Sequence, residues 1–263
     1  MPLTATDAAP PLRRTLLVIG IGAGDPNHLT LQAIEALNRA DVFFIPEKRA
    51  EAGDLARIRR DLLARFVRDG AYRMVGYTMP RRASDGDYAE GVERWHEAIA
   101  AAFAALITDE LGESQCGAFL VWGDPSLYDS TLRILERLVA SGRFALDIEV
   151  IPGISAPQAL AAKHGVALNA IGAPVLLTPG RRLAEGMAGE ADGIVIMLEV
   201  REALAAADPD LELYWGANLG LPTEALVRGR LGDVIAEVER LRTELRAAQG
   251  WIFETALLRR RGG

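Results

Sequence analysis

Cysteine is almost absent from this sequence of 263 residues, since Cys116 is the only one, and histidine occurs only three times. A disulfide framework and a cysteine-rich metal site are therefore both excluded, and we expect no bound metal. No run approaches the roughly 18 uncharged apolar residues that a membrane span requires. Residues 1–14 lack the apolar centre of a signal peptide. These absences predict a cytoplasmic protein that does not act on membranes.

Positive charge is also scarce, because the formal net charge is −7. Proteins that bind nucleic acids need a basic surface to displace counterions from phosphates, so we expect no nucleic-acid partner. All but two of the 29 basic residues are arginines. The planar guanidinium suits carboxylates, so a polycarboxylate ligand would be compatible with the pairs Arg81-Arg82 and Arg181-Arg182.

Half of the residues are apolar, which is enough for a substantial core. In the first part of the chain, short apolar runs alternate with longer helical patterns. Strands are expected at 16–21, 42–45, 72–77, 118–122 and 148–151, and helices at 29–38, 55–68, 88–111 and 131–141. This alternation predicts a largely parallel sheet covered by helices, with ligands at the carboxyl ends of the strands.

The second part of the chain is richer in strands, which indicates a mixed sheet with hairpins. Strands are expected at 175–178, 193–198, 211–215, 225–228 and 251–258, and helices at 156–164 and 233–248. Pro152 and Gly153 break the preceding strand, and Ser155 with Gln158 has the spacing of a helix capping box. We expect a flexible segment at 1–14, a first α/β lobe at 15–152 and a second at 153–263.

The segment 18–30 runs from a buried strand through Gly20, Gly22 and Gly24 into a helix. Glycine lets backbone and ligand approach closely. A dinucleotide fingerprint would need glycine where Asp25 stands. Glu47, about 20 residues later, could still mimic a ribose-binding acid, so a nicotinamide-dependent oxidoreductase remains an alternative.

A second loop, at 121–130, repeats the triplet Gly-Asp-Pro after another apolar strand. A single triplet of this kind is more often a turn than a site, because these residues are the preferred turn formers. Two triplets at the carboxyl ends of two strands instead indicate a shared ligand pocket.

Four segments give the chain its resemblance to the tetrapyrrole methyltransferase family, which methylates uroporphyrinogen and the precorrins. They are the loop 20–30, the loop 122–128, the Ile-Pro-Gly-Ile-Ser-Ala turn at 151–156 and the strand 194–197. Within the family, the segments 44–48, 88–96 and 122–130 are most similar to the deacetylating members of aerobic cobalamin synthesis. This resemblance implies methylation of precorrin-5 at C1 with release of acetate. A methyltransferase acting on another carbon, or a non-catalytic tetrapyrrole-binding protein, is the alternative.

The resemblance also implies S-adenosylmethionine as cofactor, held between the lobes of a homodimeric protein. Its implied contacts are Gly22, Ala23, Trp122, Gly123, Asp124, Leu127, Ser155, Ala156, Met197 and Ala225. The family usually has proline where this chain has Ala23, so the path of the first loop is left open.

Loss of the acetyl group needs water attack or equivalent proton handling, for which the candidate side chains are Glu47, Asp85, His96, Tyr128 and Asp129. We expect Tyr128 and Asp129 to act in this step, because they directly follow the cofactor loop. Residues expected to bind the tetrapyrrole are Arg81, Arg82, Glu47 and Asp85.

Overall fold

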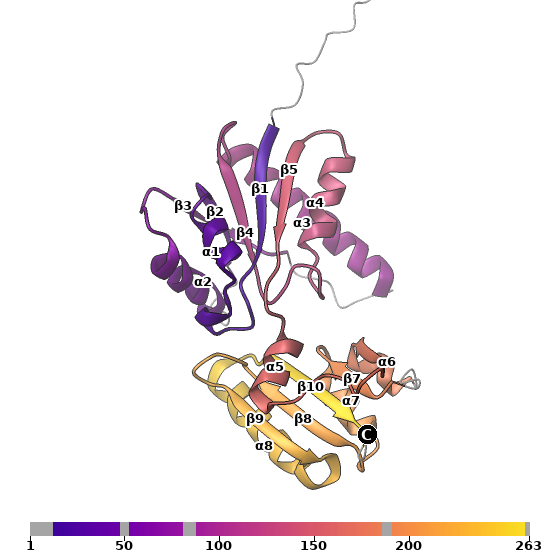
Figure 1. The fold of residues 1–263 in the computed structure, drawn as a ribbon. Coiled ribbons are helices and arrows are strands. Elements are labelled where there is room, and N and C mark those ends of the chain that lie inside the picture. The colour runs from indigo at the N-terminus through magenta and orange to yellow at the C-terminus, as the bar shows by residue number, and fades with distance from the viewer. Residues whose placement is uncertain (1–12, 48–52, 81–87, 186–190, 261–263) are drawn as a thin grey trace, which may run out of the picture.

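The computed structural model describes residues 13–47, 53–80, 88–185 and 191–260, which form two lobes around one five-stranded sheet each. The carboxyl ends of the first-lobe strands face the second lobe (Figure 1). The two-lobe α/β fold predicted from the sequence, with a parallel first sheet and a mixed second sheet, is confirmed. Of the expected N-terminal segment 1–14, residues 1–12 lie outside the described part of the chain.

The first sheet has the strand order β3-β2-β4-β1-β5, and all of its neighbouring strands are parallel. Its strands are β1 (Arg13–Gly20), β2 (Val42–Glu47), β3 (Arg73–Thr78), β4 (Cys116–Val121) and β5 (Ala145–Ile151). The accompanying helices are α1 (Leu31–Leu37), α2 (Gly53–Phe66), α3 (Tyr88–Glu110) and α4 (Thr131–Ala140).

Helices cover both faces of this sheet, so its strands carry almost continuous apolar runs. Leu17 and Ile19 of β1 pack under α1 and α2, whereas Leu16 and Val18 pack under α3 and α4. This alternation follows from the two-residue period of a strand. Burial on both faces is typical of parallel sheets.

The direction of the chain crossovers reverses between β2 and β4. The chain leaves β2 through α2 on one face of the sheet and leaves β4 through α4 on the opposite face. The pairing of β2 with β4 ends at Phe44 opposite Phe119, although both strands continue beyond these residues. The two strands therefore separate at their carboxyl ends, at the kind of switch point where open α/β sheets bind ligands.

The second sheet has the order β6-β7-β10-β8-β9. Only β6 and β7 are parallel, and the other neighbouring pairs are antiparallel. Its elements are α5 (Ala156–His164), β6 (Val175–Thr178), α6 (Gly180–Ala184), β7 (Gly193–Ile196), α7 (Val200–Ala206), β8 (Glu212–Ala217), β9 (Ala225–Arg230), α8 (Leu231–Gln249) and β10 (Glu254–Arg259).

Two short helices, α6 and α7, were not predicted from the sequence. With five and seven residues they are shorter than the window in which helical periodicity can be recognised. Among the described helices, none is both long and apolar enough to cross a membrane.

The prediction of a capping box at the start of α5 is wrong, because its hydrogen bonds do not form. Ser155 is the N-cap residue, but its hydroxyl donates to Oε1 of Gln158 and makes no bond to the helix backbone. The expected lobe boundary at 152 and 153 falls in the turn that connects β5 to α5.

Candidate functional site

The two glycine loops lie against each other at the ends of β1 and β4. Gly22 and Gly123 form an antiparallel backbone bridge, in which the Gly22 N–H donates to Gly123 O at 3.2 Å and the Gly123 N–H donates to Gly22 O at 2.8 Å. Their φ angles of 79° and 69° lie in the region that favours glycine. The two loops that the sequence predicted to share a pocket are therefore adjacent.

Two further glycines show how closely the strand ends approach. A Cβ atom on Gly153 would lie 2.1 Å from Gly123 O, and one on Gly20 would lie 2.6 Å from Gly153 N. Real Cβ atoms do not approach other atoms so closely. The backbones at the ends of β1, β4 and β5 thus pack so closely that only glycine fits at Gly20 and Gly153.

Asp124 ties the second loop to the turn after β5. Its Oδ2 accepts a hydrogen bond from Gly153 N at 2.9 Å, and its Oδ1 accepts from Ser126 N at 2.8 Å and from the Ser126 hydroxyl. Burial alone would raise the pKa of Asp124, but these hydrogen bonds lower it overall. Both carboxylate oxygens of Asp124 therefore already accept hydrogen bonds from the protein itself.

The expected cofactor residues Ala23, Ala156 and Met197 meet in one apolar cluster. This cluster also contains Leu160 of α5 and Leu257 of β10, so the first loop, α5 and the second sheet all contribute to it. Ser155, only 3% exposed, lies beside it, with its Cα 3.7 Å from the position of a Cβ on Gly123.

Three other expected cofactor residues lie elsewhere in this region. Ala225 packs in the cluster on the opposite face of the second sheet. The Trp122 ring faces the ring of Phe253 in the second lobe, with centroids 5.2 Å apart. Leu127 lies in the second loop, where its N–H donates to Asp124 O at 3.2 Å.

The loop between β8 and β9 was not identified from the sequence as part of the site. A Cβ on Gly24 would lie 2.6 Å from Leu219 O, and one on Gly220 would lie 2.4 Å from Asp25 N, so this loop touches the first glycine loop directly. Turn residues between two strands are too common in sequences to reveal such a contact.

Asn218 fixes the conformation of this loop. It is fully buried and adopts a φ of 49°. Its amide group donates to the Thr223 hydroxyl at 3.3 Å and to Gln249 Oε1 at 3.4 Å, and accepts from Phe253 N at 3.0 Å. One side chain therefore joins the loop to the end of α8 and to the segment before β10.

The side chains of Tyr128 and Asp129 interact with different parts of the protein. Tyr128 is 45% exposed, and its hydroxyl interacts electrostatically with Arg181 of α6, across the gap between the lobes. Burial raises the pKa of Tyr128. Asp129 accepts a hydrogen bond from Thr131 N at 2.7 Å at the start of α4 and interacts electrostatically with Arg59 and Tyr77.

The expected substrate residues are only partly described by the structure. Glu47 lies at the end of β2 and forms an ion pair with Arg60 at 2.5 Å. Arg81, Arg82 and Asp85 lie outside the described residues.

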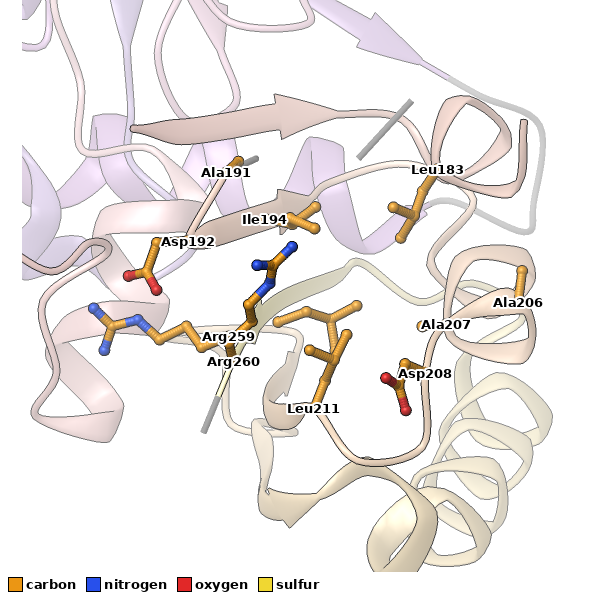
Figure 2. A pocket seen from close by; sticks show the side chains of 11 residues that line it. Leu183, Ala191, Asp192, Ile194, Ala206, Ala207, Asp208, Leu211, Arg259 and Arg260 are labelled. Carbon is orange, nitrogen blue, oxygen red and sulfur yellow. The ribbon is translucent and has the colours of Figure 1, made fainter. Parts of the chain in front are cut away.

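Of two cavities in the described part of the structure, one adjoins these loops. A cavity of about 640 Å³ lies between α2 and the second lobe, and it is lined by Gly24 of the first glycine loop, Leu221 of the β8–β9 loop and Trp251 before β10, among others. None of the expected cofactor residues lines it. A smaller cavity of about 250 Å³ lies within the second lobe, where Leu183, Ile194 and Leu211 surround it (Figure 2). Neither glycine loop contributes a residue to that cavity.

Comparison with known proteins places these features in a family. The model of the Tetrapyrrole (Corrin/Porphyrin) Methylases matches residues 15–235. Precorrin-6A synthase (deacetylating) of Sinorhizobium sp is 47% identical over 249 residues, which cover 94% of this chain and 95% of that relative.

Solved structures show the same similarity. A cobalamin synthesis related protein (CobF) from Corynebacterium diphtheriae matches with a TM-score of 0.79 and 36% identity, covering 94% of this chain and 98% of that one. Uroporphyrin-III C-methyltransferase from Thermus thermophilus, complexed with S-adenosyl homocysteine, matches with a TM-score of 0.55. It covers 93% of this chain and 96% of that one at 19% identity, which shows a shared fold.

Proposed function

The chain belongs to the tetrapyrrole (corrin/porphyrin) methylase family, and from this premise we propose that it methylates precorrin-5 at C1 and releases acetate, giving precorrin-6A. The choice of reaction within the family rests on the 47% identity to the Sinorhizobium precorrin-6A synthase, which extends over nearly the whole of both chains. Membership of the family also removes the reason for considering a nicotinamide-dependent oxidoreductase.

The observation that best supports this function is the convergence of the glycine loops with the second sheet. We assign S-adenosylmethionine to the space beside the Gly22–Gly123 bridge, with Ala23, Ser155, Ala156 and Met197 around it. Three of these four side chains are small, and next to Gly123 only the Cα of Ser155 comes within 4 Å of a Cβ position. This cradle suits a ligand that must approach the backbone closely.

The remaining assigned contacts follow the family resemblance, namely Trp122, Asp124, Leu127 and Ala225. Because Asp124 already accepts bonds from Ser126 and Gly153, we infer that its main contribution is to hold the loop in shape. Direct contact with the cofactor would then use backbone groups of the loop.

The cofactor supplies an activated methyl group, so the chain's main task is to align the ring carbon and exclude water. Water would add to the acetyl carbonyl, and the bond from C1 to the acyl group would break to release acetate. The electron pair left on C1 would then form a bond to the methyl carbon of S-adenosylmethionine as the bond from that carbon to sulfur breaks, releasing S-adenosylhomocysteine. Asp129 or Tyr128 would accept the proton from the attacking water. Exposed apolar side chains on the strand-end loops, Tyr128, Ile154 and Leu198, suit the faces of a macrocycle.

The polar groups of the substrate would be bound by Glu47, Arg81, Arg82 and Asp85. Replacing Arg81 and Arg82 together by alanine is expected to weaken tetrapyrrole binding and leave the affinity for S-adenosylhomocysteine unchanged. Titration of the double variant with each ligand measures both effects. An unchanged tetrapyrrole affinity would remove the two arginines from the site.

The proposed reaction is tested by incubating the protein with precorrin-5 and S-adenosylmethionine labelled in its methyl group. We expect one labelled methyl group on the ring and one molecule of released acetate per turnover. Methylation without acetate release would indicate a methyltransferase for another ring carbon. Binding of the tetrapyrrole without any transfer would indicate a binding protein.

We further infer that the protein works in the cytoplasm as a homodimer. The single cysteine fits a reducing compartment. The dimer is an expectation from the family resemblance, and sedimentation velocity of the purified chain measures it.

A further inference from the structure

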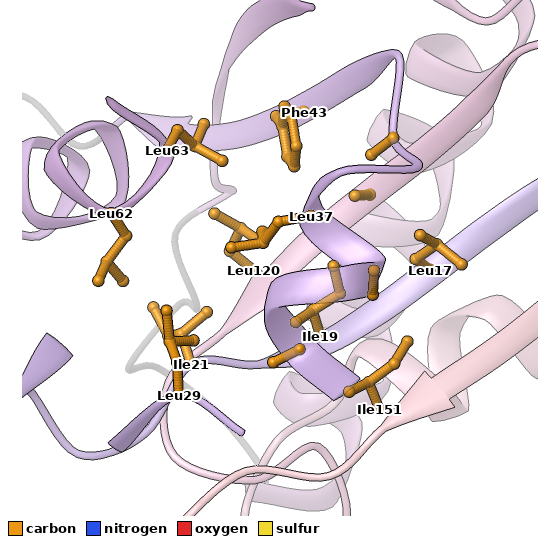
Figure 3. Close-up of a cluster of buried hydrophobic side chains, with 14 of the residues drawn as sticks. Leu17, Ile19, Ile21, Leu29, Leu37, Phe43, Leu62, Leu63, Leu120 and Ile151 are labelled. Carbon is orange, nitrogen blue, oxygen red and sulfur yellow. The ribbon is translucent and has the colours of Figure 1, made fainter. Parts of the chain in front are cut away.

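Arg59 is a buried cation whose role the proposed reaction does not yet explain. It lies on α2 and is only 8% exposed. Its Nε donates to Leu120 O at 3.0 Å, and its Nη1 donates to Leu55 O at 3.2 Å. Leu62 and Leu63 of α2 point into the same core cluster as Leu120, which holds the helix against the sheet (Figure 3).

Arg59 has no carboxylate partner within ion-pair distance among residues 13–47, 53–80, 88–185 and 191–260. Both of its partners are neutral carbonyl groups, and burial lowers the pKa of its guanidinium. A buried charge without a counter-ion is costly, and proteins normally pair it. A ligand that brings an anion to this point would remove that cost.

The location of the guanidinium favours a ligand. Leu120 lies beyond Phe119, the last residue of β4 that pairs with β2, so Arg59 binds a carbonyl at the point where the two strands separate. This is one of two switch points of the sheet, the other lying between β4 and β1 at the glycine loops, and α/β proteins bind their ligands at such points. Asp129 of the second loop and Tyr77 of β3 both interact electrostatically with Arg59.

The charge of Asp129 favours the charged form of Arg59, but neither neighbour lies within ion-pair distance of the guanidinium in the described part of the chain. Asp129 caps the start of α4 through Thr131 N and forms no ion pair with Arg59 within the described chain. Burial raises the pKa of Tyr77, so its hydroxyl stays protonated and can donate a hydrogen bond. The Tyr77 hydroxyl is therefore a neutral neighbour that brings no negative charge to the guanidinium.

We propose that Arg59 binds a carboxylate on a side chain of the tetrapyrrole substrate. A guanidinium matches a carboxylate in shape and can bind both of its oxygens. The macrocycle is favoured over the carboxylate of the methionine moiety because Arg59 lies on the β2 side of β4, whereas the cofactor loops lie on the β1 and β5 side. The class of ligand rests on the proposed function.

The test measures two ligands on matched variants. Uroporphyrin, a stable tetrapyrrole with acetate and propionate side chains, is titrated by fluorescence, and S-adenosylhomocysteine by calorimetry. The variants are Arg59→Gln, which removes the charge, and Arg59→Lys, which keeps the charge and a donor for Leu120 O but loses the planar fork. Arg68→Gln is the control, because it removes an exposed arginine that follows the same helix.

Arg59→Gln is expected to weaken uroporphyrin binding by about tenfold to a hundredfold, the range for loss of a charged hydrogen bond, with S-adenosylhomocysteine affinity unchanged. Arg59→Lys should show a smaller loss, and Arg68→Gln none. If Arg59→Gln does not fold, Arg59→Lys takes its place in the test. Weaker uroporphyrin binding by a folded Arg59→Lys variant then supports the proposal.

Three results would overturn the assignment: unchanged uroporphyrin affinity, equal losses for both ligands, or a loss confined to S-adenosylhomocysteine. The outcome of the precorrin-5 assay does not depend on the outcome of this binding test. A protein that does not convert precorrin-5, yet loses uroporphyrin binding in Arg59→Gln, would refute the reaction and retain the role of Arg59.

Discussion

The two Gly-Asp-Pro triplets form the same local turn but hold different parts of the molecule together. In both, an aspartate Oδ1 accepts from the backbone N–H two residues later at 2.8 Å, Asp25 from Asn27 and Asp124 from Ser126. Asp124 also binds Gly153 with its second oxygen. The first triplet instead leads into the 3-10 helix η1 (Pro26–His28) and touches Gly220 of the second lobe.

The triplet itself therefore determines only a local turn. Tertiary contacts determine which segments of the protein that turn connects. The second triplet joins the ends of β4 and β5 inside the first lobe. The first triplet joins that lobe to its neighbour. Substitutions in the two loops should therefore have different consequences, although the local sequences are alike.

The largest effect is expected at Gly153, on which the second loop rests. In Gly153→Ala the new Cβ would lie 2.1 Å from Gly123 O, so the backbone must move. We expect a loss of roughly 3 kcal/mol or more in the free energy of unfolding, measured by denaturant titration. Gly70→Ala is the control, because nothing lies within 4 Å of its Cβ position. Equal stability of the two variants would contradict the close packing of the strand ends.

An intermediate effect is expected from Asp124→Asn. The amide has one oxygen where the carboxylate uses two, so a hydrogen bond to a charged group is lost, at a cost of about 1–2 kcal/mol. The lowered pKa of Asp124 stabilises the fold above the unfolded value of about 3.9, and this contribution is lost as the pH falls through the folded value.

The unfolding free energies of the parent protein and Asp124→Asn should therefore differ at neutral pH and converge in acid. Denaturant titrations at several pH values measure this convergence. A difference that is independent of pH would show that the charge of Asp124 is not involved.

The smallest effect is expected from Asp25→Asn, the matched change in the first loop. The amide oxygen can still accept from Asn27 N, so the unfolding free energy should change by no more than about 0.5 kcal/mol. A loss as large as that of Asp124→Asn would mean that the two loops are equivalent after all.

The sequence predicted the two-lobe fold because its signals are local. Buried strands such as β1 and β4 are continuous apolar runs, and each is followed by a glycine turn that marks its end. The same signals placed Gly22 and Gly123 at neighbouring strand ends. The pairing of these two glycines is then a consequence of the strand order.

Contacts between distant segments could not be predicted. Arg59 belongs to an ordinary amphipathic helix pattern, and nothing nearby in the sequence shows that its side chain reaches Leu120 O. Asn218 looks like an ordinary turn residue in the sequence, although its side chain joins three segments of the second lobe. The placement of the expected cofactor residues Met197 and Ala225 on opposite faces of the second sheet likewise depends on packing.

The strand order has a consequence for synthesis on the ribosome. β1 emerges before both of its neighbours in the sheet. The pairing of Thr15 with Cys116 places β4 about 100 residues later, and the pairing of Arg13 with Ala145 places β5 about 130 residues later. Such distant partners slow folding, because a long loop must close before the pairing is gained. Both hydrogen-bonding edges of β1 and its apolar faces therefore stay exposed through much of translation, which makes this strand the part of the nascent chain most open to wrong pairing.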